Sequence, residues 1–149
     1  MNKHEKLAHK YFTDGYNCAQ AVFAAFHEEM GIDEKTALRQ ASAFGGGMGR
    51  LREVCGAVSG MYMVLGTLYG YDDAKNDEAK TVLYSRVQKM AEEFKEEYGT
   101  IICRELLGES GAQIPTPTPR NPEFYKERPC LSFVVSAARI MSEFIEENK

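Results

Sequence analysis

An uncharged run from residue 54 to residue 71 constrains the fold more than any other stretch of the chain. The run contains four glycines, a serine, a threonine and three tyrosines. It is therefore too polar and too short for a membrane-spanning helix. We interpret it as the buried central helix of a folded domain, and we expect no membrane span.

Apolar residues elsewhere recur at intervals of three and four, which is the spacing of one helix face. Ala19, Val22, Phe23 and Phe26 show this pattern, and no useful stretch alternates with a period of two. A chain of 149 residues is long enough for one core. The sequence therefore predicts an all-α fold, a single-domain bundle of about six to seven helices over residues 1–149.

Capping residues suggest where the helices begin and end. Asn17, Asp33 and Thr100 are candidate N-caps, and Gly31 and Gly99 are candidate ends. The expected helices cover residues 3–12, 17–31, 33–44, 54–70, 76–98, 100–107 and 130–146.

All five prolines fall between Pro115 and Pro129. Proline removes a backbone donor and fixes φ, so we expect an irregular loop over the surface rather than a helix. Phe124 and Tyr125 are the aromatic residues of this loop, and we expect them to anchor it as a cover over the last two cysteines.

Charge and the N-terminal segment exclude several classes of function. The net charge is −4, which argues against a nucleic-acid partner. Residues 1–12 are polar and charged and do not resemble a secretory signal. We therefore expect a cytoplasmic protein whose thiols are kept reduced.

The four cysteines are the strongest functional signal. Cys18, Cys55, Cys103 and Cys130 are far apart in sequence, which excludes a C-x-x-C motif, a zinc ribbon and the common ferredoxin patterns. Each falls at the start of an expected helix, where unpaired N–H groups favour a thiolate, and Arg52, Arg104 and Arg128 lie close in sequence. We therefore expect the four thiols to converge in space.

Two hypotheses follow, beside the ordinary alternative that the cysteines are small buried apolar residues. In the first, the protein is a thiol–disulfide oxidoreductase, with Cys55 as the activated, low-pKa nucleophile and another cysteine resolving the mixed disulfide. In the second, the four thiolates bind an iron–sulfur cluster or zinc.

Glycines surround the second cysteine, in the sequence GGGMGRLREVCG. The segment lacks the Gly-Lys-Ser/Thr ending of a phosphate-binding loop and follows an expected helix rather than a strand. We expect the glycines to adopt positive φ and to allow close approach of the backbone. In that role Gly46, Gly47 and Gly56 would bring backbone N–H groups to the cysteine site or its cofactor.

The ordered set GYNCAQAV, CGAVSG, CRELLG and Cys130 resembles the C_GCAxxG_C_C family of redox-active proteins. The resemblance covers nearly the whole chain. It implies a redox function carried by the four cysteines, with a redox partner that is a protein or a small thiol. It leaves the partner, the cysteine pairing and the formation of a homo-oligomer open.

Overall fold

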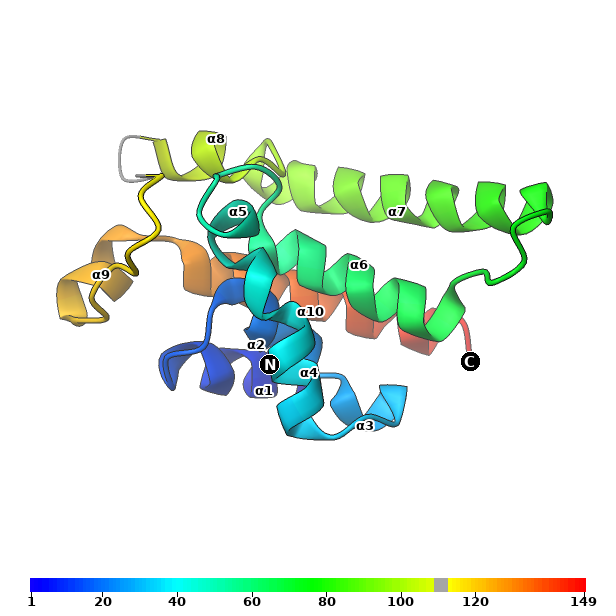
Figure 1. The fold of residues 1–149 in the computed structure, drawn as a ribbon, viewed down its shortest axis with the longest axis horizontal. Helices are drawn as coiled ribbons and strands as arrows, with labels where there is room; N and C mark the ends of the chain where they lie inside the picture. The colour runs from blue at the N-terminus through cyan, green and yellow to red at the C-terminus, as the bar shows by residue number, and fades with distance from the viewer. Residues whose placement is uncertain (109–112) are drawn as a thin grey trace.

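The computed structural model describes residues 1–108 and 113–149, and within these ranges the chain is all-α, as predicted (Figure 1). The helices are α1 (Lys3–Thr13), α2 (Cys18–Ala24), α3 (His27–Met30), α4 (Glu34–Ala41), α5 (Gly45–Met48), α6 (Gly56–Tyr69), α7 (Asp77–Tyr98), α8 (Cys103–Leu107), α9 (Pro122–Glu127) and α10 (Cys130–Glu147), with a 3-10 turn, η1 (Ser42–Phe44). Six of these helices have seven or more residues. In the described ranges the β structure is limited to one isolated antiparallel bridge, between Val54 and Ile102.

Side-chain caps explain where several helices begin. Asn17 caps α2 and accepts a hydrogen bond from the backbone N–H of Gln20, whose side chain accepts from Asn17 in return. Asp33 caps α4, so both of these predicted caps are confirmed. The predicted N-cap at Thr100 is wrong, because α8 begins at Cys103. The Thr100 hydroxyl accepts from the backbone N–H of Ile102 instead.

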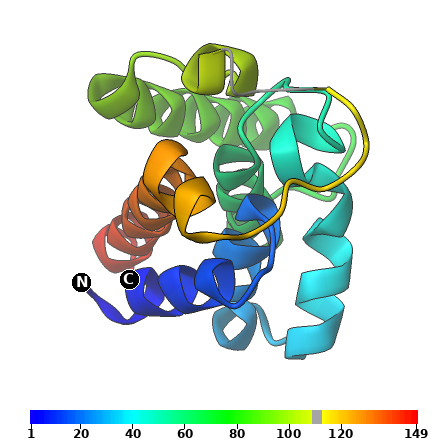
Figure 2. The ribbon, with the colours of Figure 1, turned by 90° about the vertical axis from the view of Figure 1, so that its left-hand side faces the viewer.

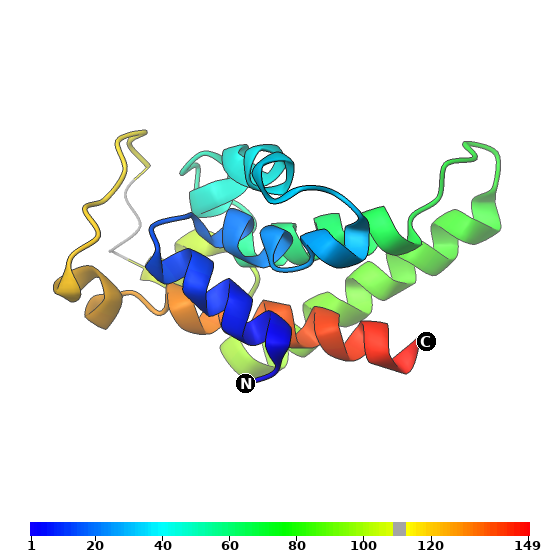
Figure 3. The same ribbon diagram turned by 90° about the horizontal axis from the view of Figure 1, so that it is seen from below.

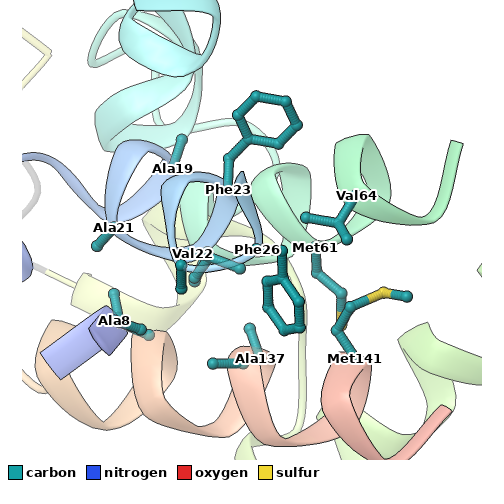
Figure 4. Packing of buried hydrophobic residues seen from close by; sticks show 14 of the residues in the cluster. Ala8, Ala19, Ala21, Val22, Phe23, Phe26, Met61, Val64, Ala137 and Met141 are labelled. Carbon is teal, nitrogen blue, oxygen red and sulfur yellow. The ribbon is translucent and has the colours of Figure 1, made fainter. Parts of the chain in front are cut away.

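The uncharged run forms the buried helix α6, as predicted. α6 packs against α2 and α10, and Phe26, Met61 and Met141 meet between these elements (Figure 4). A Cβ atom at Gly60 would lie 2.7 Å from the carbonyl oxygen of Ala19. Glycine is therefore needed where the backbones of α6 and α2 approach each other, and this close contact offsets the cost of glycine inside a helix.

The proline-rich region departs from its prediction, because it contains the helix α9. Pro122 occupies the first turn of α9, where a proline removes no helical hydrogen bond, and the Asn121 side chain caps the helix. Before α9 the chain runs without regular structure across one end of the molecule (Figure 2).

That end of the molecule holds α9, while the connection between α6 and α7 lies at the opposite end (Figure 3). α6 and α10 both begin toward the α9 end and run away from it. The N-terminal ends of two long helices are therefore directed to the same region of the fold.

Candidate functional site

All four cysteines are free thiols and stand at helix starts. Cys18, Cys103 and Cys130 are the first residues of α2, α8 and α10, and Cys55 is the residue that precedes α6. Burial raises the pKa values of Cys55, Cys103 and Cys130, and a charge on Cys18 raises each of them further, so Cys18 lies within electrostatic reach of the other three. Cys18 is thus the shared neighbour of the set.

The position of Cys18 is fixed by the residue before it. The Asn17 side chain caps α2 and also donates to the carbonyl oxygen of Ser42 at 3.0 Å. A Cβ atom at Gly45 would lie 2.4 Å from the Asn17 side chain, so glycine is required there. The cap thereby joins the start of α2 to the start of the glycine-rich stretch.

Cys55 lies deeper, with only 4% of its surface exposed. Its backbone N–H donates to the carbonyl oxygen of Ile101 at 2.8 Å, which joins the start of α6 to the chain that leads into α8. A Cβ atom at Gly56 would lie 2.3 Å from the sulfur of Cys18. The Cys18 sulfur therefore rests on the α6 backbone directly after Cys55, a contact that any larger residue at position 56 would block.

Cys103 is held under residues 45–52, which we call the glycine segment. A Cβ atom at Gly47 would lie 2.7 Å from the Cβ of Cys103, and φ at Gly47 is +72°. Arg52 is 2% exposed, and its Nη1 donates to the Cys103 sulfur at 3.8 Å. The backbone N–H of Cys103 donates to the carbonyl oxygen of Glu53 at 2.6 Å. The glycine segment therefore fixes both the third thiol and its cation.

The expected roles of the glycines are met in part. Gly46 and Gly47 have positive φ, and Gly47 and Gly56 make close approaches, as expected. The carbonyl oxygens of Gly45, Gly46 and Gly47 accept from the backbone N–H groups of residues 50, 52 and 53. These contacts are structural, and the cofactor-binding role of Gly46, Gly47 and Gly56 stays a prediction.

A cavity of about 410 Å³ opens beside two of the thiols, Cys18 and Cys130. Four arginines line it: Arg50, Arg52, Arg120 and Arg128. The described lining residues include no aspartate or glutamate. Aromatic and proline side chains complete its walls, among them Phe12, Phe124, Pro115 and Pro117.

Comparison with known proteins gives one match. A family model described as "Putative redox-active protein (C_GCAxxG_C_C)" matches residues 16–144. The chain belongs to this family. No curated protein and no solved structure matches the chain.

The central motif of the C_GCAxxG_C_C family, here CGAVSG, has a clear structural basis in this chain. Its two glycines lie where α6 meets the start of α2. Gly56 accommodates the Cys18 sulfur, and Gly60 accommodates the Ala19 carbonyl oxygen. The motif therefore joins the first and second cysteines of the family pattern.

The prediction of an activated, low-pKa thiol at Cys55 is wrong. Burial raises the pKa of Cys55 well above its usual value, and a charge on Cys18 raises this pKa further. The backbone N–H groups of Val58 and Ala57 lower the pKa of Cys55, as a helix start should, but they do not outweigh burial. The helix position was predicted correctly and its electrostatic consequence was not.

Burial also dominates at the other two shifted thiols. It raises the pKa of Cys103, against the lowering effects of Arg52 and Arg128. It raises the pKa of Cys130 to about 12, again against a lowering effect of Arg128. Arg104 pairs with Glu53 at 3.1 Å, whereas Arg52 and Arg128 lower the pKa of Cys103 and Arg128 also lowers that of Cys130.

The structure gives the metal hypothesis no support. Within residues 1–108 and 113–149, no three Cys, His, Asp or Glu side chains are grouped so that they could hold a metal ion.

In the same part of the chain, no helix combines the length and the apolar character that crossing a membrane requires.

Sequence reasoning missed Arg50 and Arg120 as residues of the site. Arg50 belongs to the glycine segment and Arg120 to the proline-rich region, and both line the cavity. The available signal was that each arginine lies in a segment expected to approach the cysteines. Their meeting at one cavity depends on tertiary packing.

Proposed function

We propose that this protein carries out thiol–disulfide exchange, with Cys18 as the attacking thiol and Cys55 as the resolving thiol. The observation that carries the proposal is the position of Cys18. Its side chain is half-buried in the cavity wall, where a substrate can approach it, and its sulfur rests on Gly56, next to Cys55.

The first step is attack by the Cys18 thiolate on one sulfur of a substrate disulfide. A new S–S bond joins Cys18 to that sulfur, and the old S–S bond breaks. The departing sulfur leaves with the bonding electron pair and takes up a proton as a thiol. The product is a mixed disulfide at Cys18.

In the second step the Cys55 thiolate attacks the Cys18 sulfur and forms the Cys18–Cys55 bond. The mixed-disulfide bond breaks, and the substrate sulfur leaves with the bonding electron pair and takes up a proton. A charge on Cys18 raises the pKa of Cys55, and the mixed disulfide removes that charge. Burial, the larger cause of the raised pKa of Cys55, remains, so the mixed disulfide removes only a smaller effect that disfavours the Cys55 thiolate. Overall, two electrons and two protons pass from the protein dithiol to the substrate, and Cys18 and Cys55 become a disulfide.

We assign Cys103 and Cys130 to a second dithiol of the same site. Arg128 lowers the pKa values of both thiols, so one cation favours both thiolates. Exchange with the oxidised Cys18–Cys55 pair would transfer the disulfide to Cys103 and Cys130, and two external thiols would reduce it again and become a disulfide themselves. Reduction by external thiols is favoured in a reducing compartment, so we propose that the protein acts in the cytoplasm.

The test is to oxidise the reduced protein with one equivalent of hydroxyethyl disulfide and to map the products by mass spectrometry. We expect a Cys18–Cys55 disulfide as the first product. Cys55→Ser should trap the mixed disulfide on Cys18, and Cys18→Ser should abolish fast mixed-disulfide formation.

Two results would overturn the proposal. One is a first product that joins other cysteines while Cys18 stays a thiol. The other is anaerobically purified protein that carries stoichiometric iron or zinc released only when the thiols are alkylated.

A further inference from the structure

The cavity beside Cys18 concentrates positive charge in a protein whose net charge is −4. Four arginines line it, and they come in two pairs that are far apart in sequence: Arg50 and Arg52, and Arg120 and Arg128. Within the described part of the chain, two of them, Arg50 and Arg120, donate hydrogen bonds only to neutral acceptors. Because like charges in one cavity repel each other, a bound anion would stabilise this arrangement.

Arg120 is oriented at the cavity by several contacts. Its guanidinium lies 4.3 Å from the ring centre of Phe12 and 4.8 Å from that of Phe124. Its Nη1 donates to the Phe12 carbonyl oxygen at 3.0 Å, and its Nη2 donates to the Tyr16 carbonyl oxygen at 2.9 Å. These partners are neutral, so they orient the guanidinium without cancelling its charge.

Arg50 is oriented in the same way. Its Nε donates to the Ile114 carbonyl oxygen at 2.7 Å, and its Nη1 donates to the Thr118 hydroxyl at 3.1 Å. Burial lowers the pKa of Arg50, and the neighbouring charges of Arg52 and Arg128 lower this pKa further. A guanidinium has five N–H donors, so these two contacts leave donors for a ligand.

The walls and the size of the cavity define the ligand further. About 410 Å³ lies within the range of small-molecule sites and exceeds what a single inorganic ion fills. Phe12, Phe124, Pro115 and Pro117 present apolar surface beside the arginines. Planar guanidinium groups match the geometry of carboxylates. The features together fit an organic molecule that carries more than one carboxylate.

We propose that this cavity binds a small organic dicarboxylate, and that the substrate of Cys18 is an anionic low-molecular-weight disulfide. The second clause rests on the thiol exchange proposed above, whereas the first stands on the cavity alone. The carboxylates pair with Arg50 and Arg120, which places the disulfide beside the Cys18 sulfur. Exchange then follows the electron and proton balance already given.

The first experiment measures binding without redox chemistry. Suberate, a dicarboxylate with the chain length of 3,3′-dithiodipropionate, is titrated into Cys18→Ser protein by calorimetry at low salt. We expect one site, with affinity about tenfold weaker after Arg50→Gln, as loss of a charge-assisted contact predicts. Arg50→Lys should recover part of the affinity, because it keeps the charge.

Arg39→Gln is the matched control for this experiment. Arg39 is exposed on α4 and does not line the cavity, so its loss removes one positive charge elsewhere. Equal weakening by Arg39→Gln and Arg50→Gln, or no suberate binding at all, would overturn the proposed site.

The second experiment compares three small disulfides with wild-type protein: dianionic 3,3′-dithiodipropionate, neutral hydroxyethyl disulfide and dicationic cystamine. Each rate is divided by the rate of the same disulfide with free dithiothreitol, which removes differences in intrinsic reactivity. We expect the dianion to be favoured at least tenfold over the neutral compound, and Arg50→Gln to reduce this preference.

The outcomes separate the two proposals. Equal normalised rates for all three disulfides would overturn the substrate class and leave thiol exchange intact. Suberate binding without oxidation of Cys18 by any disulfide would keep the anion site and overturn its assignment as a substrate site, together with the proposed function.

Discussion

Two segments border the cavity, and they are held in opposite ways. The glycine segment contributes Arg50 and Arg52, and residues 113–129, which we call the proline segment, contribute Arg120 and Arg128. In the glycine segment, φ is positive at residues 46–50 and at residue 52. No residue of the proline segment has positive φ.

The hydrogen bonds of the two segments differ as well. Backbone N–H groups of residues 50, 52 and 53 donate back to carbonyl oxygens of the glycine segment, so this segment is fixed by its own main chain. The proline segment is joined to the rest of the molecule largely by side chains, such as Arg50 and Arg120. The comparison suggests that the glycine segment sets the geometry of the thiols while the proline segment covers them.

Gly47→Ala should have the largest effect. Its Cβ would lie 2.7 Å from the Cβ of Cys103 and 2.8 Å from the Cα of Arg52, at a φ of +72°. Backbone strain and overpacking together predict a loss of about 3 kcal/mol in the free energy of unfolding, measured with urea.

Gly15→Ala is the control, because φ there is +108° and no neighbouring atom lies within 4 Å of the added Cβ. It should cost only the strain, about 1 kcal/mol. Equal losses for the two variants would mean that close approach to Cys103 contributes nothing to the rigidity of the glycine segment.

Alkaline pH should lower the free energy of unfolding through two thiols. Cys103 contacts the glycine segment, and Cys130 follows the proline segment. Burial raises the pKa of Cys130 to about 12 from 9.0, and it also raises the pKa of Cys103. The unfolded chain therefore releases these protons at lower pH than the folded chain. The free energy of unfolding should be constant below about pH 8 and fall above about pH 9, by up to about 1.4 kcal/mol per pH unit for each thiol.

Urea unfolding between pH 7 and pH 9.5 checks this dependence, in a range below the ordinary ionisation of tyrosine. Cys130→Ala and Cys103→Ala should each flatten the curve. A curve that rises with pH in this range would contradict the burial of neutral thiols.

Local patterns predicted much of the fold, because they depend on neighbouring residues. Asn17 and Asp33 cap their helices as expected, and every cysteine stands at a helix start. The same reasoning missed α9, because five prolines outweighed a local signal: Asn121 as a cap followed by Pro122 in the first turn is compatible with a helix.

The site was less predictable, because burial and long-range packing decide it. The raised pKa of Cys55 depends on the depth at which α6 begins, which helix position alone does not reveal. The cavity brings Arg50 beside Arg120, and no local pattern links residues so far apart. The glycines came closer to prediction, since positive φ is a property of the residue type.

Replacing Phe124 and Tyr125 together with serine should open the cover. The ring centre of Phe124 lies 6.3 Å from that of Phe12, and the ring centre of Tyr125 lies 6.1 Å from it. We expect alkylation of Cys18 and Cys130 to accelerate about tenfold, equivalent to about 1.4 kcal/mol, when each cysteine is followed by mass spectrometry. Cys55, which is buried and does not line the cavity, should change less.

Replacing Tyr71 and Tyr84 with serine is the matched control, since these rings contact each other and do not line the cavity. Labelling rates that are the same in the two double variants would show that the proline segment only connects α8 to α10.

Thr118→Val should have the smallest effect and gives the sharpest test of side-chain attachment. The Thr118 hydroxyl accepts from Arg50 Nη1 at 3.1 Å and from Arg128 Nη2 at 3.4 Å. Valine keeps the shape of threonine and removes this acceptor. Thr118 is half-buried, so water can replace the hydroxyl, and Arg50 keeps its bond to the Ile114 carbonyl oxygen. We expect a loss of about 0.5 kcal/mol in urea unfolding. A loss above about 2 kcal/mol would mean that the proline segment contributes to stability as the glycine segment does. The proposed difference between the two segments would then be wrong.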